Sequence, residues 1–209
     1  MPIITVSPSS DPTNLHKILE VNGRPFPFVF DEDLLLNIPN LKLRDDDVLL
    51  CGYMRSGTHW NFEIINMLLN GVIETIPDRK ESLHLEQASQ EELDKFPSPR
   101  VLSSHLLFEE LPREVIDRKT KIVYLIRDPK DALVSWYTCI KKINLSYDKL
   151  WNMPLSDWLE LSIGGKMEWG SWFENMSSWE RALQNYPDHP ILLVYYEELK
   201  QVCYKYIML

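Results

Sequence analysis

The sequence has few cysteines, and they are widely spaced. Three occur among the 209 residues, Cys51, Cys139 and Cys203, and no two of them form a C-x-x-C pair. This spacing argues against a structural metal site and indicates a reducing compartment. The N-terminus also lacks the charged start and the continuous apolar core of a signal peptide, so we expect a cytoplasmic protein.

Long apolar runs and an excess of basic residues are missing too. No apolar run approaches the roughly 20 residues that cross a bilayer, so we expect no membrane partner. Lys and Arg total 22 against 31 Asp and Glu, which gives a formal net charge of −9. This balance argues against nucleic acid as the main partner. The length and the hydrophobic content of 44% predict one globular domain over residues 1–209.

The order of the apolar runs predicts the fold. Residues 1–47, rich in Pro and Asp, are interpreted as a meandering entry segment, and Asp45-Asp46-Asp47 as a solvated turn rather than metal ligands. Later patterns predict strands over 48–53, 100–105, 121–127 and 191–196, and helices over 58–70 and from Pro129 onward. Strands that alternate with helices predict the α/β class, here a P-loop-like three-layer fold with a central parallel sheet flanked by helices.

A short turn after the first predicted strand is the most informative part of the chain. Gly52 and Gly57 have the G-x-x-x-x-G spacing of a Walker A loop, but Thr58 and His59 stand where that motif has Lys and Ser/Thr. A strand–turn–helix of this kind directs backbone N–H groups to one place, which suits a phosphate or a sulfate. The loop, whose one strong cation is Arg55, is therefore predicted to bind an anion without the chemistry of an ordinary ATPase.

Chemically active side chains follow the predicted strands at the points where the strands end. Parallel sheets bind ligands beyond the carboxyl ends of their strands. That rule brings Arg55, His105, Arg127 and Tyr196 to one edge, as a polyanionic ligand and a proton transfer would require. From the pattern alone, simpler interpretations stay open: a packed histidine, a salt-bridge arginine at position 127, and a surface charge at position 55.

Several segments resemble motifs of the cytosolic sulfotransferases, which use the donor PAPS (3′-phosphoadenylyl sulfate). Residues 53–60, YMRSGTHW, resemble the YPKSGT-x-W loop, and residues 127–137, RDPKDALVSWY, resemble RNPKD-x-x-VSYY. Residues 103–106, SSHL, resemble K-[ST]-H-L, and residues 170–174 and 195–198 also look like family segments. The resemblance implies a PAPS-dependent sulfotransferase that acts on a small-molecule acceptor, which would be a phenol, an alcohol or an amine.

The resemblance also implies a role for each matched residue. His105 would be the catalytic base, Arg127 with Ser135 would hold the 3′-phosphate, and Trp60 would stack on the adenine. The predicted PAPS-binding set comprises Arg55, Ser56, Gly57, Thr58, His59, Trp60, Arg127, Ser135 and Tyr196, with Arg55 also catalytic, and the acceptor side comprises Ser103, Ser104 and His105. No divalent metal is implied.

The chain departs from the family pattern in three ways. Arg55 and Ser103 stand where the family has lysines, and the C-terminal third of the family domain is absent. The absent part includes the dimerisation motif, so we expect a monomer, and residues 202–209 do not resemble family sequence. These departures leave open a weak or inactive PAPS-binding pseudo-enzyme, a truncated isoform. A P-loop small-molecule kinase ranks lower, because the loop lacks the Lys-Ser/Thr pair.

Overall fold

A parallel four-stranded sheet forms the centre of the protein in the computed structural model, which describes residues 3–71, 73–74, 82–142 and 153–207, with side chains up to residue 202. Its strands lie in the order β5-β4-β6-β7, and all neighbouring pairs are parallel. The strands are β4 (Val48–Gly52), β5 (Val101–Ser104), β6 (Lys121–Ile126) and β7 (Ile191–Tyr195). All four strands lie within the ranges that their apolar runs predicted, so the predicted central sheet is confirmed.

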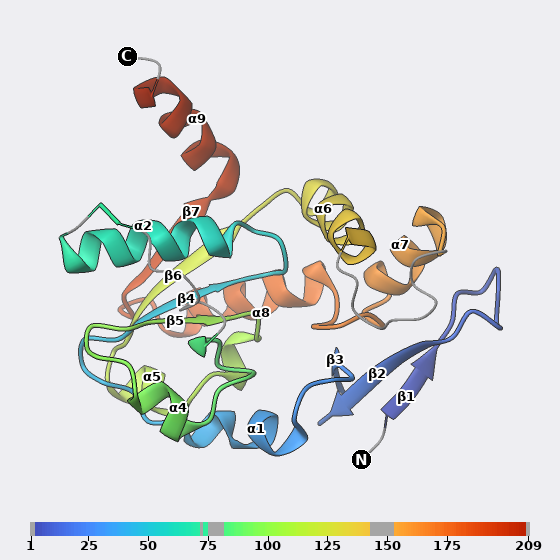
Figure 1. The fold of residues 1–209 in the computed structure, drawn as a ribbon, viewed down its shortest axis with the longest axis horizontal. Coiled ribbons are helices and arrows are strands. Elements are labelled where there is room, and N and C mark those ends of the chain that lie inside the picture. Colours follow the sequence, from blue (N-terminus) through green and yellow to red (C-terminus); the bar gives the residue numbers. More distant parts are fainter. Residues whose placement is uncertain (1–2, 72, 75–81, 143–152, 208–209) are drawn as a thin grey trace.

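Burial explains why β4 is a continuous apolar run. Every residue of β4 and β5 is buried, because the two strands are covered on both faces, whereas β7 at the edge is only partly covered. In Figure 1, α2 (Thr58–Asn70) lies in front of the sheet and α8 (Trp172–Asn185) lies behind it. On the α8 side, the rings of Tyr124 and Trp179 stack with centroids 4.2 Å apart. The result is the α/β architecture with helices on both faces that the alternation predicted.

The remaining helices surround this core. Their bounds are α4 (Gln90–Asp94), α5 (Glu114–Asp117), α6 (Pro129–Lys142), α7 (Leu155–Ile163) and α9 (Tyr196–Ile207), with a 3₁₀ turn η2 (Phe108–Glu110). The Asp128 carboxylate accepts hydrogen bonds from the N–H groups of Lys130 and Asp131, which confirms it as the cap of α6. Helix α9 projects beyond β7 (Figure 1). None of the described helices is long and apolar enough to cross a membrane.

The N-terminal segment is more regular than the sequence analysis expected. Strands β1 (Ile3–Val6), β2 (His16–Val21) and β3 (Arg24–Pro27) form a separate antiparallel sheet, followed by α1 (Glu32–Asn37) and the 3₁₀ turn η1 (Ile38–Asn40). The expectation of a meandering segment was wrong here. Its missed signal was Asn22-Gly23, where φ values of 52° and 77° form the two-residue hairpin turn that this dipeptide favours.

A buried ion pair fixes the start of the neighbouring strands β4 and β5. Arg100 lies just before β5, and its Nη2 and Nε atoms contact the Asp47 carboxylate at 2.6 and 2.8 Å. Both side chains are fully buried, and Arg100 also donates to the carbonyl oxygen of Leu93 at 2.9 Å. The interpretation of 45–47 as a solvated turn was therefore wrong for Asp47. Its carboxylate is buried because it forms an ion pair with the buried guanidinium of Arg100.

We expect Asp47→Ala to lower the free energy of unfolding by about 3–5 kcal/mol, because it leaves the buried guanidinium with only the more distant and exposed Asp94 carboxylate, 3.4 Å away. Urea denaturation measures the change. The matched control is Asp46→Ala, since Asp46 is exposed and accepts only from the Ser98 hydroxyl among the bonds found. That control should change stability by no more than about 0.5 kcal/mol. Equal losses in the two variants would contradict the role given to this ion pair.

Candidate active site

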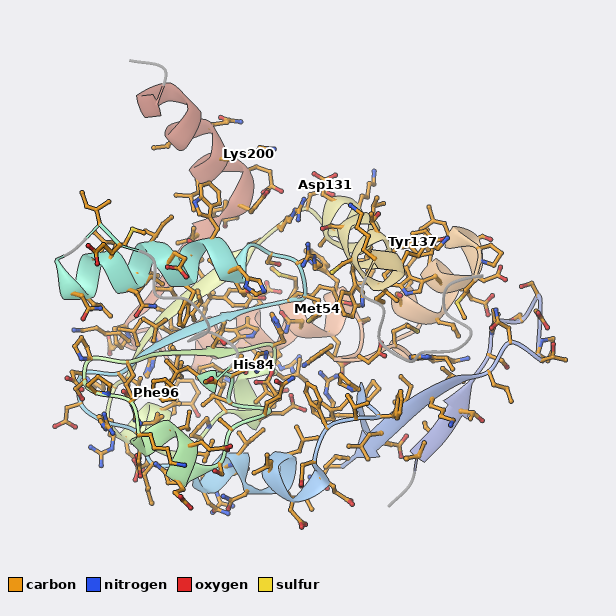
Figure 2. The ribbon with its side chains drawn as sticks, in the orientation of Figure 1. Met54, His84, Phe96, Asp131, Tyr137 and Lys200 are labelled. Atoms are coloured by element: carbon orange, nitrogen blue, oxygen red, sulfur yellow. The ribbon has the colours of Figure 1, made fainter. Side chains whose placement is uncertain are left out.

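The central sheet has a switch point where its strand order reverses. The chain leaves β4 for β5 on one side and returns to β6 on the other, so the connections diverge at the carboxyl end of β4. Parallel sheets bind ligands at such points. A cavity of about 450 Å³ opens there. It is lined by Met54, Arg55, Gly57, Thr58, His59, Trp60, His105, Arg127, Ser135 and Tyr196, and Figure 2 shows Met54 near the middle of the molecule.

The loop between β4 and α2 has the backbone shape of an anion site. Arg55 and Gly57 have φ values of 64° and 97°, so two left-handed residues turn the chain sharply into α2. Gly57 caps the helix without any side-chain hydrogen bond, and no other described side chain is recorded as capping it. The first N–H groups of this 13-residue helix therefore lie at the cavity, together with the positive end of the helix dipole.

Two arginines from different elements meet at this loop. Arg127, which follows β6, donates from Nη1 to the Arg55 carbonyl oxygen at 2.7 Å. The Arg55 side chain donates from Nε to the Ser135 hydroxyl on α6 at 3.2 Å. The sequence analysis gave Arg55 and Ser135 to different parts of the ligand, whereas the structure places them in direct contact. The two guanidinium groups concentrate positive charge at one side of the cavity.

Aromatic rings form another part of the wall. Tyr196 begins α9, and its ring lies 4.3 Å from the Arg127 guanidinium and 6.1 Å from the Trp60 ring. Trp172 on α8 donates from its indole N–H to the Arg127 carbonyl oxygen at 3.2 Å, a contact that the sequence analysis missed. These contacts give the arginine a fixed place among flat apolar surfaces.

His105 lies at the end of β5 in a defined tautomer. Its Nδ1 atom is 2.7 Å from the Gly52 carbonyl oxygen, and because a carbonyl only accepts, Nδ1 carries the hydrogen. In the neutral ring Nε2 is then the basic nitrogen. The ring is buried and lies 5.7 Å from the Trp169 ring in an edge-on arrangement. The arrangement suits a general base that is held in orientation by the backbone of β4.

Glu86 supports His105 and had no signal in the sequence. Its Oε1 accepts the backbone N–H of His105 at 2.7 Å, and its Oε2 lies 2.7 Å from His84 Nδ1. Burial alone would raise the pKa of Glu86, but the contact with His84 and the charge and N–H of His105 together hold that pKa below its ordinary value. The residue lies in a polar stretch without a motif, so only the fold brings it to the base.

The structure brings all but three of the predicted site residues to the cavity. Ser103 and Ser104 are buried within β5, where the Ser104 hydroxyl accepts from the N–H of Leu106. Ser56 lies inside the loop rather than on the cavity wall, and its hydroxyl is buried with no hydrogen-bond partner among the described residues. Within the same described residues, no group of three or more His, Cys, Asp or Glu side chains could hold a metal ion.

The comparisons with known proteins agree with this geometry. A family model described as the sulfotransferase domain matches residues 45–207. The chain belongs to the sulfotransferase family. The match reaches residue 207, so the expectation that residues 202–209 are unlike family sequence was wrong over most of that range.

Several sulfotransferases resemble this chain over much of its length. Dog sulfotransferase 1B1 is 32% identical over 87% of this chain and 62% of its own length. Mouse sulfotransferase 1B1 is 35% identical with the same coverage. The structure of mouse sulfotransferase SULT7A1 complexed with PAP is 31% identical, with a TM-score of 0.72 over 91% of this chain and 65% of that one. This sulfotransferase chain thus spans a little under two thirds of the length of such relatives.

Gly57 offers a direct test of the loop geometry in this sulfotransferase. A Cβ atom there would lie 2.8 Å from Tyr196 Cδ2, whereas one at Gly71, at the far end of α2, would meet nothing within 4 Å. Both glycines have positive φ, so alanine costs about 1–2 kcal/mol of backbone strain at either position. We expect Gly57→Ala to destabilise the protein more than Gly71→Ala in urea denaturation. Equal losses would show that the Tyr196 ring does not pack on the loop.

Proposed function

We propose that this chain transfers the sulfuryl group of PAPS to a hydroxyl or amine of a small-molecule acceptor. One observation carries the proposal: Arg55, Arg127, Ser135, the start of α2 and His105 surround a single cavity of about 450 Å³. The relative with a TM-score of 0.72 was crystallised with PAP, the desulfated donor, which supports the choice of ligand.

The cavity suits the anionic groups of PAPS. Two buried polar atoms beside it, the Ser56 hydroxyl and Arg127 Nε, have no hydrogen-bond partner among the described residues. Leaving such groups unpaired is costly, so they fit a ligand with several acceptor oxygens. The N–H groups of residues 56–58 would hold the 5′-phosphosulfate, and Arg127 with Ser135 would hold the 3′-phosphate. Trp60 and Tyr196 offer flat surfaces beside the purine.

His105 would supply the proton transfer. Bound PAPS supplies an activated sulfuryl group, and no metal is required for that chemistry. His105 Nε2 takes the proton of the acceptor hydroxyl or amine while Nδ1–H stays on the Gly52 carbonyl. Arg55 and the N–H groups of the loop stabilise the negative charge that develops on the donor side. Charge stabilisation and positioning are the main contributions in this class of transfer.

The surroundings of His105 support a flat, largely apolar acceptor. The Trp169 ring lies 5.7 Å from His105, and Trp136 and Phe30 lie 6.0 and 5.7 Å from Trp169. Such an aromatic cluster favours a phenol or another small cyclic compound over a charged one. The cytoplasmic location and the monomeric state remain predictions from the sequence.

Binding of PAP tests the nucleotide part of the proposal. We expect isothermal titration to show PAP binding, and Arg127→Met to weaken it by roughly 10- to 100-fold through loss of a charged hydrogen-bond donor. The matched control is Arg181→Met on α8, because Arg181 is exposed and pairs with Glu109 instead. That control should bind like the wild type. An unmodified protein that shows no binding at millimolar PAP would refute the proposed function.

Loss of the base tests the transfer itself. We expect His105→Asn to lower kcat by about 10²–10⁴ with little change in PAP affinity, since the Asn amide can still donate to the Gly52 carbonyl but cannot accept the proton. An assay with labelled PAPS and a panel of phenols, alcohols and amines measures kcat. His189→Gln is the control, because the one hydrogen bond recorded for the His189 side chain joins it to the Thr120 carbonyl oxygen, and His189 does not line the cavity. A wild type that binds PAP but transfers to no acceptor would favour the pseudo-enzyme alternative.

A further inference from the structure

A short segment beside β5 brings a carboxylate to the base. The Ser103 N–H donates to the Leu83 carbonyl at 2.9 Å, and the Leu85 N–H donates to the Ser103 carbonyl at 3.0 Å. The segment therefore runs parallel to β5 for one bridge, between His84 and Ser103. Figure 2 shows His84 in the interior of the molecule. This backbone pairing fixes Glu86 next to the end of β5, where His105 begins.

The Glu86 carboxylate joins two histidines. One oxygen accepts the backbone N–H of His105 and the other lies against His84 Nδ1, both at 2.7 Å. Glu86 itself is fully buried, and the two imidazole rings lie 5.2 Å apart at an angle of 64°. A buried ionised carboxylate is costly unless it is paired. Its partners here are the backbone of the proposed base and a second histidine.

The charge of Glu86 reaches the groups that face it from neighbouring elements. Burial raises the pKa of the Cys51 thiol on β4, and the Glu86 charge raises it further. Burial also raises the pKa of Glu110 on η2, against the lowering effect of Arg24, which lies 2.9 Å from it. The titratable groups recorded as acting on Glu86 are His84 and His105, and His105 lines the same cavity as Arg55 and Arg127. His105 therefore lies close to the Glu86 carboxylate and shares the cavity wall with two arginines.

We propose that Glu86, held in place by His84, is the positioning residue that orients His105 and stabilises its protonated form during transfer. This inference rests on the proposed function. When Nε2 takes the acceptor proton, the imidazolium that results keeps its Nδ1–H on the Gly52 carbonyl, and the Glu86 carboxylate offsets its charge. Glu86 takes up no proton in this step, and His84 Nδ1, 2.7 Å from the second carboxylate oxygen, helps to keep the carboxylate ionised.

A merely structural role for Glu86 makes different predictions. If the carboxylate served only to hold the chain beside β5, its loss would lower stability and PAP affinity together and leave the pH dependence of kcat unchanged. A positioning role separates these quantities, because the charge acts on the protonated base and not on the nucleotide. Neither Glu86 nor His84 lines the nucleotide cavity.

Glu86→Gln tests the charge while the side-chain shape is kept. We expect kcat to fall about 10-fold, with PAP affinity and acceptor KM within twofold, because general-base efficiency depends on the protonated base being stabilised. The acidic limb of the kcat–pH profile should move to lower pH, since the protonated base loses its negative neighbour. The matched control, Glu110→Gln, removes a nearby half-buried carboxylate that pairs with Arg24 instead, and it should leave that limb in place.

His84→Leu tests the same arrangement through the partner of the carboxylate. It removes the contact that holds the pKa of the buried Glu86 low, so the neutral carboxyl is favoured and offsets the charge of protonated His105 less. We expect the acidic limb to move to lower pH, as in Glu86→Gln. This variant also keeps the inference testable if Glu86→Gln does not fold. A shift to higher pH in either variant, or no shift in either, would overturn the positioning role.

A readout without turnover separates this inference from the proposed function. Nitrogen-15 NMR of labelled histidine rings follows the protonation of His105 in the wild type, Glu86→Gln and His84→Leu. Displacement of its titration to lower pH in both variants supports the coupling even if no acceptor is found. An unchanged titration in both variants refutes the coupling, whether or not the wild type binds PAP. Failure of PAP binding alone, with the NMR displacements present, refutes the proposed function and not the coupling between Glu86 and His105.

Discussion

The backbone between Gly52 and Gly57 is the part of the structure on which the rest of the site depends. The Gly52 carbonyl oxygen orients His105, the Arg55 carbonyl oxygen holds Arg127, and the bare Cα of Gly57 leaves room for the Tyr196 ring. These partners come from the ends of three different strands. Because β4 is buried on both faces, the loop that follows it starts from a rigid position. One short segment of main chain therefore sets the relative places of the proposed base, a cation and an aromatic wall.

Anchoring through main-chain atoms explains how the site tolerates a departure from the family motif. Arg55 replaces the family lysine, yet its carbonyl oxygen still serves Arg127 whatever the side chain is. The Arg55 side chain donates to the Ser135 hydroxyl. Replacing lysine by arginine therefore changes the charged group in the cavity but not the backbone contacts of the loop. A planar guanidinium and a compact ammonium offer different hydrogen-bond geometries. The replacement therefore bears on the proposed transfer rather than on the fold.

Strong periodic patterns explain which elements could be predicted. Continuous apolar runs at 48–52 and 121–126 occur because both strands lie inside the sheet, and Gly71 ends α2 in the left-handed conformation expected of a helix stop. The N-terminal sheet was missed because its strands are short and β3 contains two prolines. Asp47 was misread because its burial depends on Arg100, 53 residues away. Patterns within one segment carry no information about such a partner.

By itself the sequence determined the α/β class, the strand–turn–helix loop after β4 and the set of residues that follow the strand ends, because these depend on local spacing and on the rule that parallel strands end at one edge. Only the tertiary structure decided that Ser103 and Ser104 are buried and that Arg55 contacts Ser135. It also decided that the carboxylate of Glu86, from a stretch without a motif, accepts the backbone N–H of His105. Each of these depends on which way a side chain faces or on a contact across distant segments. Burial and charge pairing in the folded state decide such contacts, and no periodicity along the chain records them.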